Sequence, residues 1–321
     1  MATATEERLP RRTPRPLINL EQIVRLYVIG TEGQVARSLR EAATNRSDVV
    51  IGCAGRPDVD ILRSDLVQKA LLAFSPDIVI NPAAYTAVDR AESEPDLAFA
   101  INRDGAGIVA AAAAQLGIPI IHLSTDYVFD GKKDSPYIET DAVAPSSVYG
   151  RSKLAGEYAV AAANARNVIL RTSWIYAPFG SNFVRTMLRL SADRDKLAVV
   201  DDQIGCPTFA PDIAIAVLAI AYKIHSGGWQ QHLAGVTHLA GPDEITWCGF
   251  ARQIMQAKQK RDGRLVVVEA ISTTDYPTAA ARPANSRLRC ERLATNFDVR
   301  MPPLERSLEN CMKRLLGGAV N

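Results

Sequence analysis

The sequence predicts an α/β fold built on a doubly wound parallel sheet, with a smaller, partly interleaved C-terminal lobe. Short runs rich in Val and Ile alternate with helical segments, and this regularity weakens after about residue 175. The apolar runs lie at 25–30, 49–53, 77–81, 118–124 and 167–174. Runs that are apolar on both faces are typical of parallel strands covered by helices on both sides.

Helical periodicity fills the intervals between these runs, at 36–43, 66–74, 105–117 and 154–165. We therefore divide the chain into three parts. Residues 1–23 are polar, with several prolines and arginines, and are expected to form a loose extension. Residues 24–175 form a dinucleotide-binding domain of the Rossmann type. Residues 176–321 form mainly a substrate-binding lobe, from which some segments return to the first domain.

The segment GTEGQVA at 30–36 predicts a strand, a tight turn and a helix. Gly30 and Gly33 would let the backbone approach a pyrophosphate, whose charge is held by the amides of a helix N-terminus. Ala36 stands where the dinucleotide fingerprint has its last glycine, and it is small enough for close packing of helix on strand. An ordinary strand-to-helix turn gives the same pattern, so a second signal is needed.

That second signal is the pair Tyr149 and Lys153 in a helical stretch, because residues four apart share one face of a helix. A nearby cation lowers the pKa of a phenol, which would make Tyr149 a general acid for a carbonyl oxygen. Thr125 follows the run at 118–124 and could share the developing charge. A solvated helix face and a strand-end turn are the alternatives. His122 is expected to be a core histidine.

Composition excludes several classes of protein. The chain has 321 residues, 47% hydrophobic, and a net charge of +2, so it lacks the basic excess of a nucleic-acid binder. It also lacks an uninterrupted apolar stretch of roughly 18 residues, so no membrane span is predicted. Five scattered cysteines without metal spacing favour a cytoplasmic protein. No metal site is predicted; the adjacent Asp201 and Asp202 are expected to belong to a polar loop.

Seven segments carry a family resemblance. In order they are GTEGQVA (30–36), NPAAYTAVDRAE (81–92), STDYVFDG (124–131), YGRSK (149–153), RTSWIYAPFGSNFVRTML (171–188), DDQIGCPT (201–208) and RPANSRL (282–288). From about residue 25 to the C-terminus the chain resembles the extended short-chain dehydrogenase/reductase superfamily and, within it, the dTDP-4-dehydrorhamnose reductases. The resemblance implies reduction of the C4 ketone of a dTDP-4-dehydro-6-deoxysugar, with dTDP-4-dehydro-L-rhamnose as expected substrate and dTDP-L-rhamnose as product.

The resemblance also implies roles for single residues. The catalytic residues would be Thr125, Tyr149 and Lys153. Together with Gly30 from the turn, the cofactor residues would be Gly33, Gln34, Val35, Asp60, Ile61, Ala83, Ala84, Tyr85, Asn102, Tyr149 and Lys153. The substrate residues would be Thr125, Asp126, Trp174, Asn182, Phe183, Arg282 and Asn285. Core packing is the alternative for Trp174, and a surface position is the alternative for Arg282.

Arg56 bears on the choice of cofactor. It follows the second apolar run, where NAD-selective folds usually carry an acidic residue. A cation there could meet a 2′-phosphate, so NADPH is the expected cofactor, with NADH as a second option.

Two alternatives stay open, one from another class of protein and one closer in kind. One is a non-catalytic, NADP-binding regulatory subunit that uses the fold as a platform. The other is a nucleotide-sugar epimerase or dehydratase, although Thr125 is followed by Asp126 and Tyr127 and not by the Asp-Glu pair usual in dehydratases. A dTDP-sugar is the expected small-molecule partner, and the sequence leaves a homodimer open.

Overall fold

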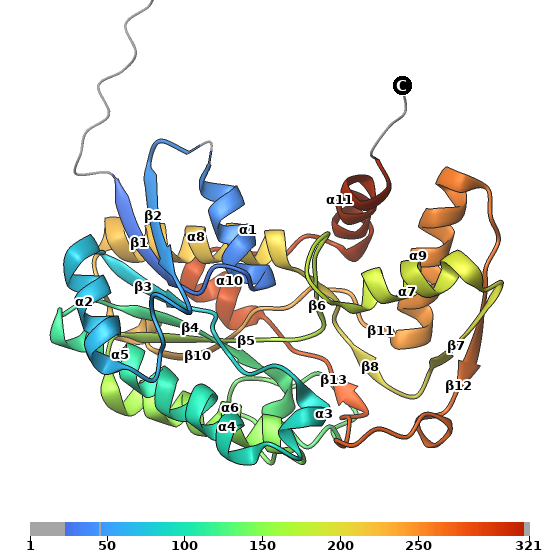
Figure 1. Ribbon diagram of the computed structural model, residues 1–321, viewed down its shortest axis with the longest axis horizontal. Coiled ribbons are helices and arrows are strands. Elements are labelled where there is room, and N and C mark those ends of the chain that lie inside the picture. Colours follow the sequence, from blue (N-terminus) through green and yellow to red (C-terminus); the bar gives the residue numbers. More distant parts are fainter. Residues whose placement is uncertain (1–22, 45, 318–321) are drawn as a thin grey trace, which may run out of the picture.

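A parallel six-stranded sheet forms the centre of the larger lobe (Figure 1), in the order β10-β5-β4-β3-β1-β2. The computed structural model describes residues 23–44 and 46–317, so residues 1–22 of the expected extension lie outside the described residues. The strands are β1 (Val24–Ile29), β2 (Val49–Ala54), β3 (Ile78–Asn81), β4 (Ile120–Thr125), β5 (Asn167–Thr172) and β10 (Gly235–His238). The doubly wound fold and its first five strands are confirmed, whereas β10 was not predicted.

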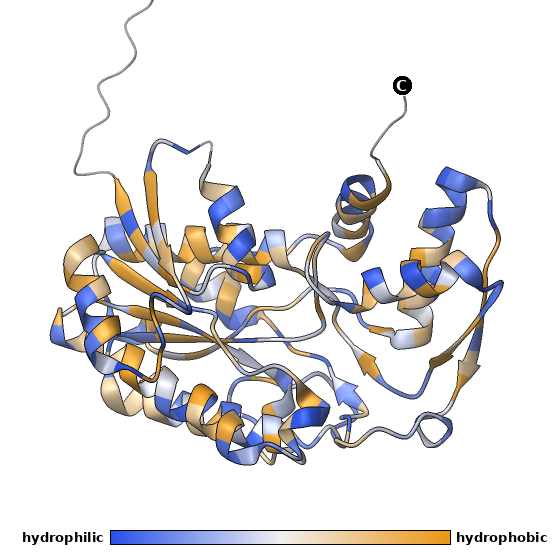
Figure 2. Cartoon of the chain, in the orientation of Figure 1, coloured by the Kyte–Doolittle hydropathy of each residue, from blue (hydrophilic) through white to orange (hydrophobic). Residues whose placement is uncertain are grey.

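Helices cover both faces of this sheet, and its apolar strands lie between them (Figure 2). One face carries α1 (Gln34–Ala43), α8 (Ala210–Gly227) and α10 (Glu291–Phe297). The other face carries α2 (Ser64–Phe74), α5 (Ala106–Gln115) and α6 (Val148–Ala163), with α3 (Val88–Ala91) and α4 (Pro95–Phe99) beside α6. Val and Ile side chains from both faces of the strands fill the two cores, as the continuous apolar runs predicted.

The smaller lobe is built from α7 (Phe183–Asp193), α9 (Trp247–Asp262) and α11 (Leu304–Leu316) around its own apolar core. Its short strands are β6 (Ile175–Tyr176), β7 (Lys196–Val200), β8 (Ile204–Gly205), β9 (Thr208–Phe209), β11 (Ile245–Thr246), β12 (Val267–Ile271) and β13 (Asn285–Ser286). Between β9 and β11 the chain returns to the larger lobe through α8 and β10. The two lobes are therefore interleaved along the sequence.

The stretch Pro95–Gln115 is long and apolar enough, by length and composition, to cross a membrane. In the fold it consists of α4, a π-helical turn at Ala100–Gly105, and α5. These segments pack against α6 and α2, and buried alanines of α5 belong to the core. We interpret the stretch as a core helix of the larger lobe.

The π-helical turn lies very close to α6. Asn102, in that turn, is fully buried and donates a hydrogen bond from Nδ2 to Oγ of Ser152 (2.8 Å). Gly156, one turn further along α6, faces the main-chain carbonyl of Asn102, and an added Cβ there would overlap that oxygen. The approach of the two backbones therefore requires glycine at this position.

We expect Gly156→Ala to destabilise the protein by roughly 2 kcal/mol or more, because the added methyl meets backbone that cannot rotate away. Urea denaturation measures the loss. The matched control is Gly227→Ala at the end of α8, where an added Cβ meets nothing within 4 Å. Equal stability of the two variants would contradict this packing.

Candidate active site

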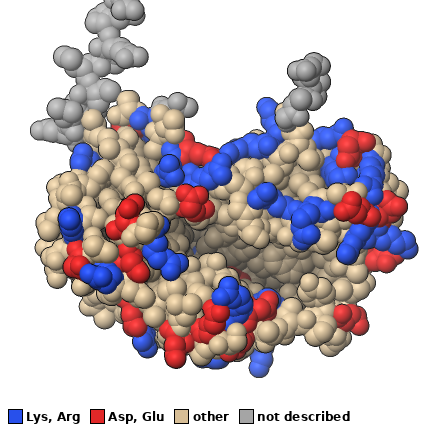
Figure 3. Space-filling view, in the orientation of Figure 1, with Lys and Arg blue, Asp and Glu red and all other residues tan. Residues whose placement is uncertain are grey.

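A groove of about 510 Å³ lies at the carboxyl ends of β1, β2 and β3, where the glycine turn joins β1 to α1. Nine of the expected cofactor residues line it: Gly30, Gly33, Gln34, Val35, Arg56, Asp60, Ile61, Ala83 and Ala84. Gly30 has φ +101°, a conformation that favours glycine, and an added Cβ there would meet nothing. The groove therefore fits a dinucleotide, with its pyrophosphate against the N-terminus of α1. Figure 3 shows the surface hollowed between the two lobes.

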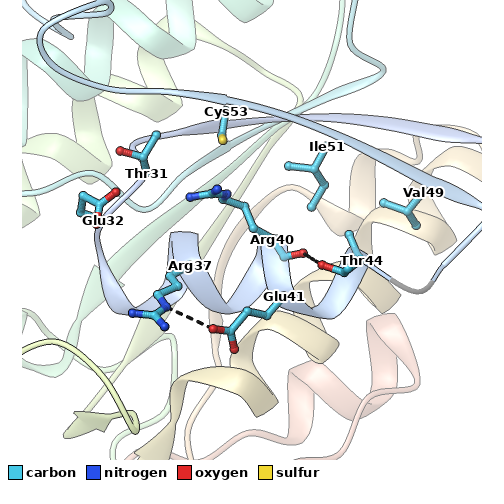
Figure 4. Close-up of a pocket in the computed structure, with 10 residues that line it drawn as sticks. Thr31, Glu32, Arg37, Arg40, Glu41, Thr44, Val49, Ile51 and Cys53 are labelled. Carbon is cyan, nitrogen blue, oxygen red and sulfur yellow. Dashed lines mark hydrogen bonds and ion pairs between the residues drawn. The ribbon is translucent and has the colours of Figure 1, made fainter.

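A second pocket, of about 590 Å³, adjoins this groove at Thr31 and Glu32 (Figure 4). It lies between α1 and the edge strand β2. Arg40 of α1 extends toward Cys53, near the end of β2, while Arg37 is bound to Glu41 by an ion pair of 3.1 Å. Arg40 was not singled out from the sequence. It provides a second arginine, besides Arg56, near the end of β2.

Thr125 and Tyr149 are brought together as the sequence predicted. Thr125 ends β4 and is buried; its hydroxyl donates to Oδ1 of Asp126 (2.9 Å) and accepts from the amide of Tyr127 (3.2 Å). Tyr149 is the second residue of α6, whose first turn is capped by the Ser147 hydroxyl. The Thr125 side chain lies close enough to the Tyr149 phenol to lower its pKa. The two hydroxyl groups therefore form one polar centre at the edge of the sheet.

The expected lowering of the Tyr149 pKa is wrong for this structure. Burial raises the pKa of Tyr149 above its ordinary value, Asp126 and Tyr127 raise it further, and the Thr125 side chain acts in the opposite direction. Lys153 does not oppose this, because its ammonium group donates to the carbonyl of Leu123 (2.6 Å) and faces His122. Burial lowers the pKa of Lys153 to about 8, against the charge of Glu157.

Asn102 and Tyr85 lie behind the site rather than along the groove. The Asn102 side chain accepts from the amide of Tyr85 (2.8 Å) and donates to its carbonyl (3.1 Å). The Tyr85 hydroxyl donates to Glu94 (2.5 Å). Asn102 thus ties the segment after β3 to α6, which matches its expected role of steadying the helix region and gives it no place on the groove wall.

Two aromatic substrate candidates belong to one cluster. Trp174, with φ +48°, stacks on Trp247 with ring centroids 3.4 Å apart and planes at 7°. Phe183 packs against Trp247 (4.5 Å) and Phe250 (5.6 Å). Trp247 was not singled out from the sequence. Thr246, capping α9 with its hydroxyl, is the sequence signal that could have placed Trp247 at a helix start beside the cleft.

The polar substrate candidates are already bonded within the protein. Asn182 caps α7 and donates to Gln34 (2.9 Å) and to the carbonyl of Ala177 (2.9 Å). Asn285 donates to the carbonyls of Lys133 (2.6 Å) and Ser135 (2.9 Å).

Arg282 forms an ion pair of 2.6 Å with Asp89 of α3. Asn182, Asn285 and Arg282 are therefore engaged in contacts within the protein that the sequence did not predict.

Asp201 and Asp202 lie in a polar loop. Asp201 accepts from the Thr246 hydroxyl (2.5 Å), and Asp202 accepts from the amide and hydroxyl of Thr273 (2.9 and 2.6 Å). Across residues 23–44 and 46–317, no three His, Cys, Asp or Glu side chains gather in a way that could hold a metal ion.

Asp126 gives a pH-dependent prediction. Burial raises its pKa to about 6 from 3.8, against hydrogen bonds from Ser286 and Thr125. The folded state therefore binds the proton more tightly than the unfolded state, and stability falls as pH rises from about 4 to about 6. We expect Asp126→Asn to gain about 2–3 kcal/mol over the wild type between pH 4 and pH 7.5, measured by urea denaturation.

Asp130→Asn is the control for this experiment, because a hydrogen bond from Tyr137 lowers the pKa of Asp130. A lowered pKa makes the Asp130 carboxylate stabilise the folded state more as pH rises. The Asp130→Asn variant should therefore lose stability relative to the wild type as pH rises. Parallel pH curves for the two variants would contradict the assignment.

Comparison with known proteins identifies the family. Residues 24–316 match the family described as RmlD substrate binding domain. The dTDP-4-dehydrorhamnose reductase of Sinorhizobium fredii is 50% identical over 293 residues, covering 91% of this chain and 98% of that protein. The dTDP-4-dehydrorhamnose reductase of Bacillus anthracis, solved with NADP, has a TM-score of 0.83 at 35% identity and covers 90% and 99% of the two chains. The UDP-glucose 4-epimerase of Thermus thermophilus, 19% identical with a TM-score of 0.73 over 92% and 100% of the chains, shares the fold alone. The chain belongs to the dTDP-4-dehydrorhamnose reductase family of extended short-chain dehydrogenases/reductases.

Proposed function

We propose that this protein reduces the C4 ketone of dTDP-4-dehydro-L-rhamnose to dTDP-L-rhamnose with NADPH, NADH being the second option. Two observations carry the proposal: Thr125 at the end of β4 lies beside Tyr149 of α6, and a groove that fits a dinucleotide lies at the carboxyl ends of β1, β2 and β3 in the same parallel sheet. Three relatives that cover 90–91% of this chain carry the name of that activity.

The residues suggest the following division of work. When bound, NADPH supplies the hydride that reduces the ketone carbon. Tyr149 donates its proton to the ketone oxygen, and Thr125 hydrogen-bonds to the same oxygen as negative charge develops. The raised pKa keeps Tyr149 protonated at neutral pH, which is the form that reduction consumes. Lys153 lies one helical turn away, where it could anchor the nicotinamide ribose.

The alternatives fit the site less well. A dehydratase needs an acid and a base after the threonine, but Tyr127 occupies the second position and packs its ring against Tyr149 at 5.5 Å. A regulatory subunit would not need Thr125 and Tyr149 side by side. A reductase therefore accounts for the arrangement of Thr125, Tyr127 and Tyr149 better than either alternative.

The cell compartment and assembly are further parts of the proposal. The five cysteines are free thiols, which supports a cytoplasmic location. A homodimer stays a proposal that light scattering can test.

Replacing the phenol should abolish most of the activity. We expect Tyr149→Phe to lower kcat on the order of a hundredfold or more, because the proton donor is lost. Thr125→Val should lose roughly tenfold, since Tyr149 remains. Loss of NADPH absorbance with dTDP-4-dehydro-L-rhamnose measures both.

Tyr158→Phe is the matched control, because Tyr158 lies on the same helix and is 62% exposed. The proposal is refuted if the wild-type protein oxidises neither NADPH nor NADH, or if Tyr149→Phe is as fast as Tyr158→Phe.

Arg56 should favour NADPH over NADH, since a guanidinium pairs well with the 2′-phosphate that only NADPH carries. We expect Arg56→Ser to raise KM for NADPH about tenfold and to leave KM for NADH within about twofold. Arg261→Ser in α9 removes the same charge from the smaller lobe and should change neither value. Equal changes of both KM values in Arg56→Ser would mean that Arg56 does not read the 2′-phosphate.

A further inference from the structure

We propose that a buried polar ladder between β4 and α6 fixes the catalytic helix, and that His122 is the positioning residue for Lys153. The ladder consists of His122 and Ser124 on β4 and of Lys153 and Glu157 on α6. The inference rests on the proposed function and adds to it a residue that acts through the catalytic lysine.

The spacing of the two elements allows two rungs to form. Alternate residues of a strand point to one face, so His122 and Ser124 both face α6, roughly 6.6 Å apart along the strand. Lys153 and Glu157 are four apart on a helix and share a face, roughly 6.0 Å apart along its axis. α6 runs antiparallel to β4, because Asn164 after its last turn donates to the carbonyl of Ile118, whereas Tyr149 in its first turn lies beside Thr125. The long side chains of Lys153 and Glu157 therefore cross to reach His122 and Ser124.

The contacts show both rungs. Nζ of Lys153 lies 3.5 Å from Nε2 of His122. The Ser124 hydroxyl donates to Oε1 of Glu157 (2.5 Å), which also binds Arg171 of β5. The four ladder side chains are at most 5% exposed. Polar groups this deeply buried stabilise a structure only when they are paired, so the pairing selects one position of α6 along the strand.

His122 can accept a hydrogen bond from the Lys153 ammonium group only when its ring is neutral. Burial lowers its pKa well below the ordinary value, and the charge of Lys153 lowers it further, while the Asn81 backbone acts in the opposite direction. A neutral imidazole has one acceptor nitrogen, and Nε2 is the one facing the ammonium group. Glu157 of α6 is the charged group that opposes the lowered pKa of Lys153.

The ladder ends at the reacting groups. Thr125 follows Ser124 on β4, and Tyr149 lies one turn before Lys153 on α6. A slip of α6 by one residue, about 1.5 Å along its axis, would break both rungs and part the two hydroxyl groups. The ladder therefore links the placement of Lys153 to the placement of Tyr149.

Two substitutions of His122 separate positioning from simple packing. His122→Gln keeps an acceptor atom, whereas His122→Met fills similar space with only a weak one. We expect His122→Met to lower kcat about tenfold, to keep KM for the dTDP-sugar within about twofold, and to raise Kd for NADPH severalfold. His122→Gln should stay within about threefold of the wild type in all three.

Ile121→Val, on the same strand but facing the opposite core, controls for lost stability. The inference is overturned if His122→Met matches Ile121→Val in kcat and Kd, or if the Gln and Met variants lose activity equally. A wild type that binds NADPH but reduces no dTDP-sugar would refute the proposed function alone. The Kd for NADPH would then test the ladder, and an unchanged Kd in His122→Met would overturn it.

Discussion

The buried ion pair between Glu157 of α6 and Arg171 of β5 is the interaction on which the site depends. The two side chains are 3–4% exposed and meet through two bonds, Nε to Oε1 (2.9 Å) and a terminal nitrogen to Oε2 (2.6 Å). Taking two charges out of water costs several kcal/mol each, and only a well-aligned, two-pronged contact offsets that cost. If α6 lay elsewhere, Glu157 and Arg171 would each be a buried charge without a partner. The ion pair therefore fixes the position of α6 against β5.

Burial also explains why the phenol behaves differently from the sequence-based expectation. A lysine four residues away lowers a tyrosine pKa when both groups share a polar pocket. Here α6 is pressed against the sheet, so loss of water raises the pKa of Tyr149, and Lys153 donates to a strand carbonyl. The resulting site holds a protonated phenol beside Thr125, which suits an enzyme that must deliver a proton during reduction.

The sequence predicted the parts of this protein that rest on local patterns. Five sheet strands, the glycine turn and the pair Tyr149 and Lys153 each carry their signal within a few residues, and parallel strands must end at one edge. β10 escaped prediction because the four residues GVTH are short, partly polar and recruited by β5 from more than sixty residues away. The π-helical turn at Ala100–Gly105 and the stacking of Trp247 on Trp174 arise from tertiary packing, which no spacing in the chain encodes.

The roles of the substrate candidates were the hardest to predict, because a polar side chain can bond to other parts of the protein as well as to a ligand. Arg282 meets Asp89 of the larger lobe, so a diphosphate would have to share or displace that carboxylate. Asn285 holds the loop at Lys133 and Ser135, and Asn182 reaches the glycine turn through Gln34. Residues from the smaller lobe thus fasten it to the larger one. The polar groups that the family resemblance assigns to the sugar nucleotide are the same groups that make these bonds, so a sugar nucleotide that used them would have to compete with the bonds.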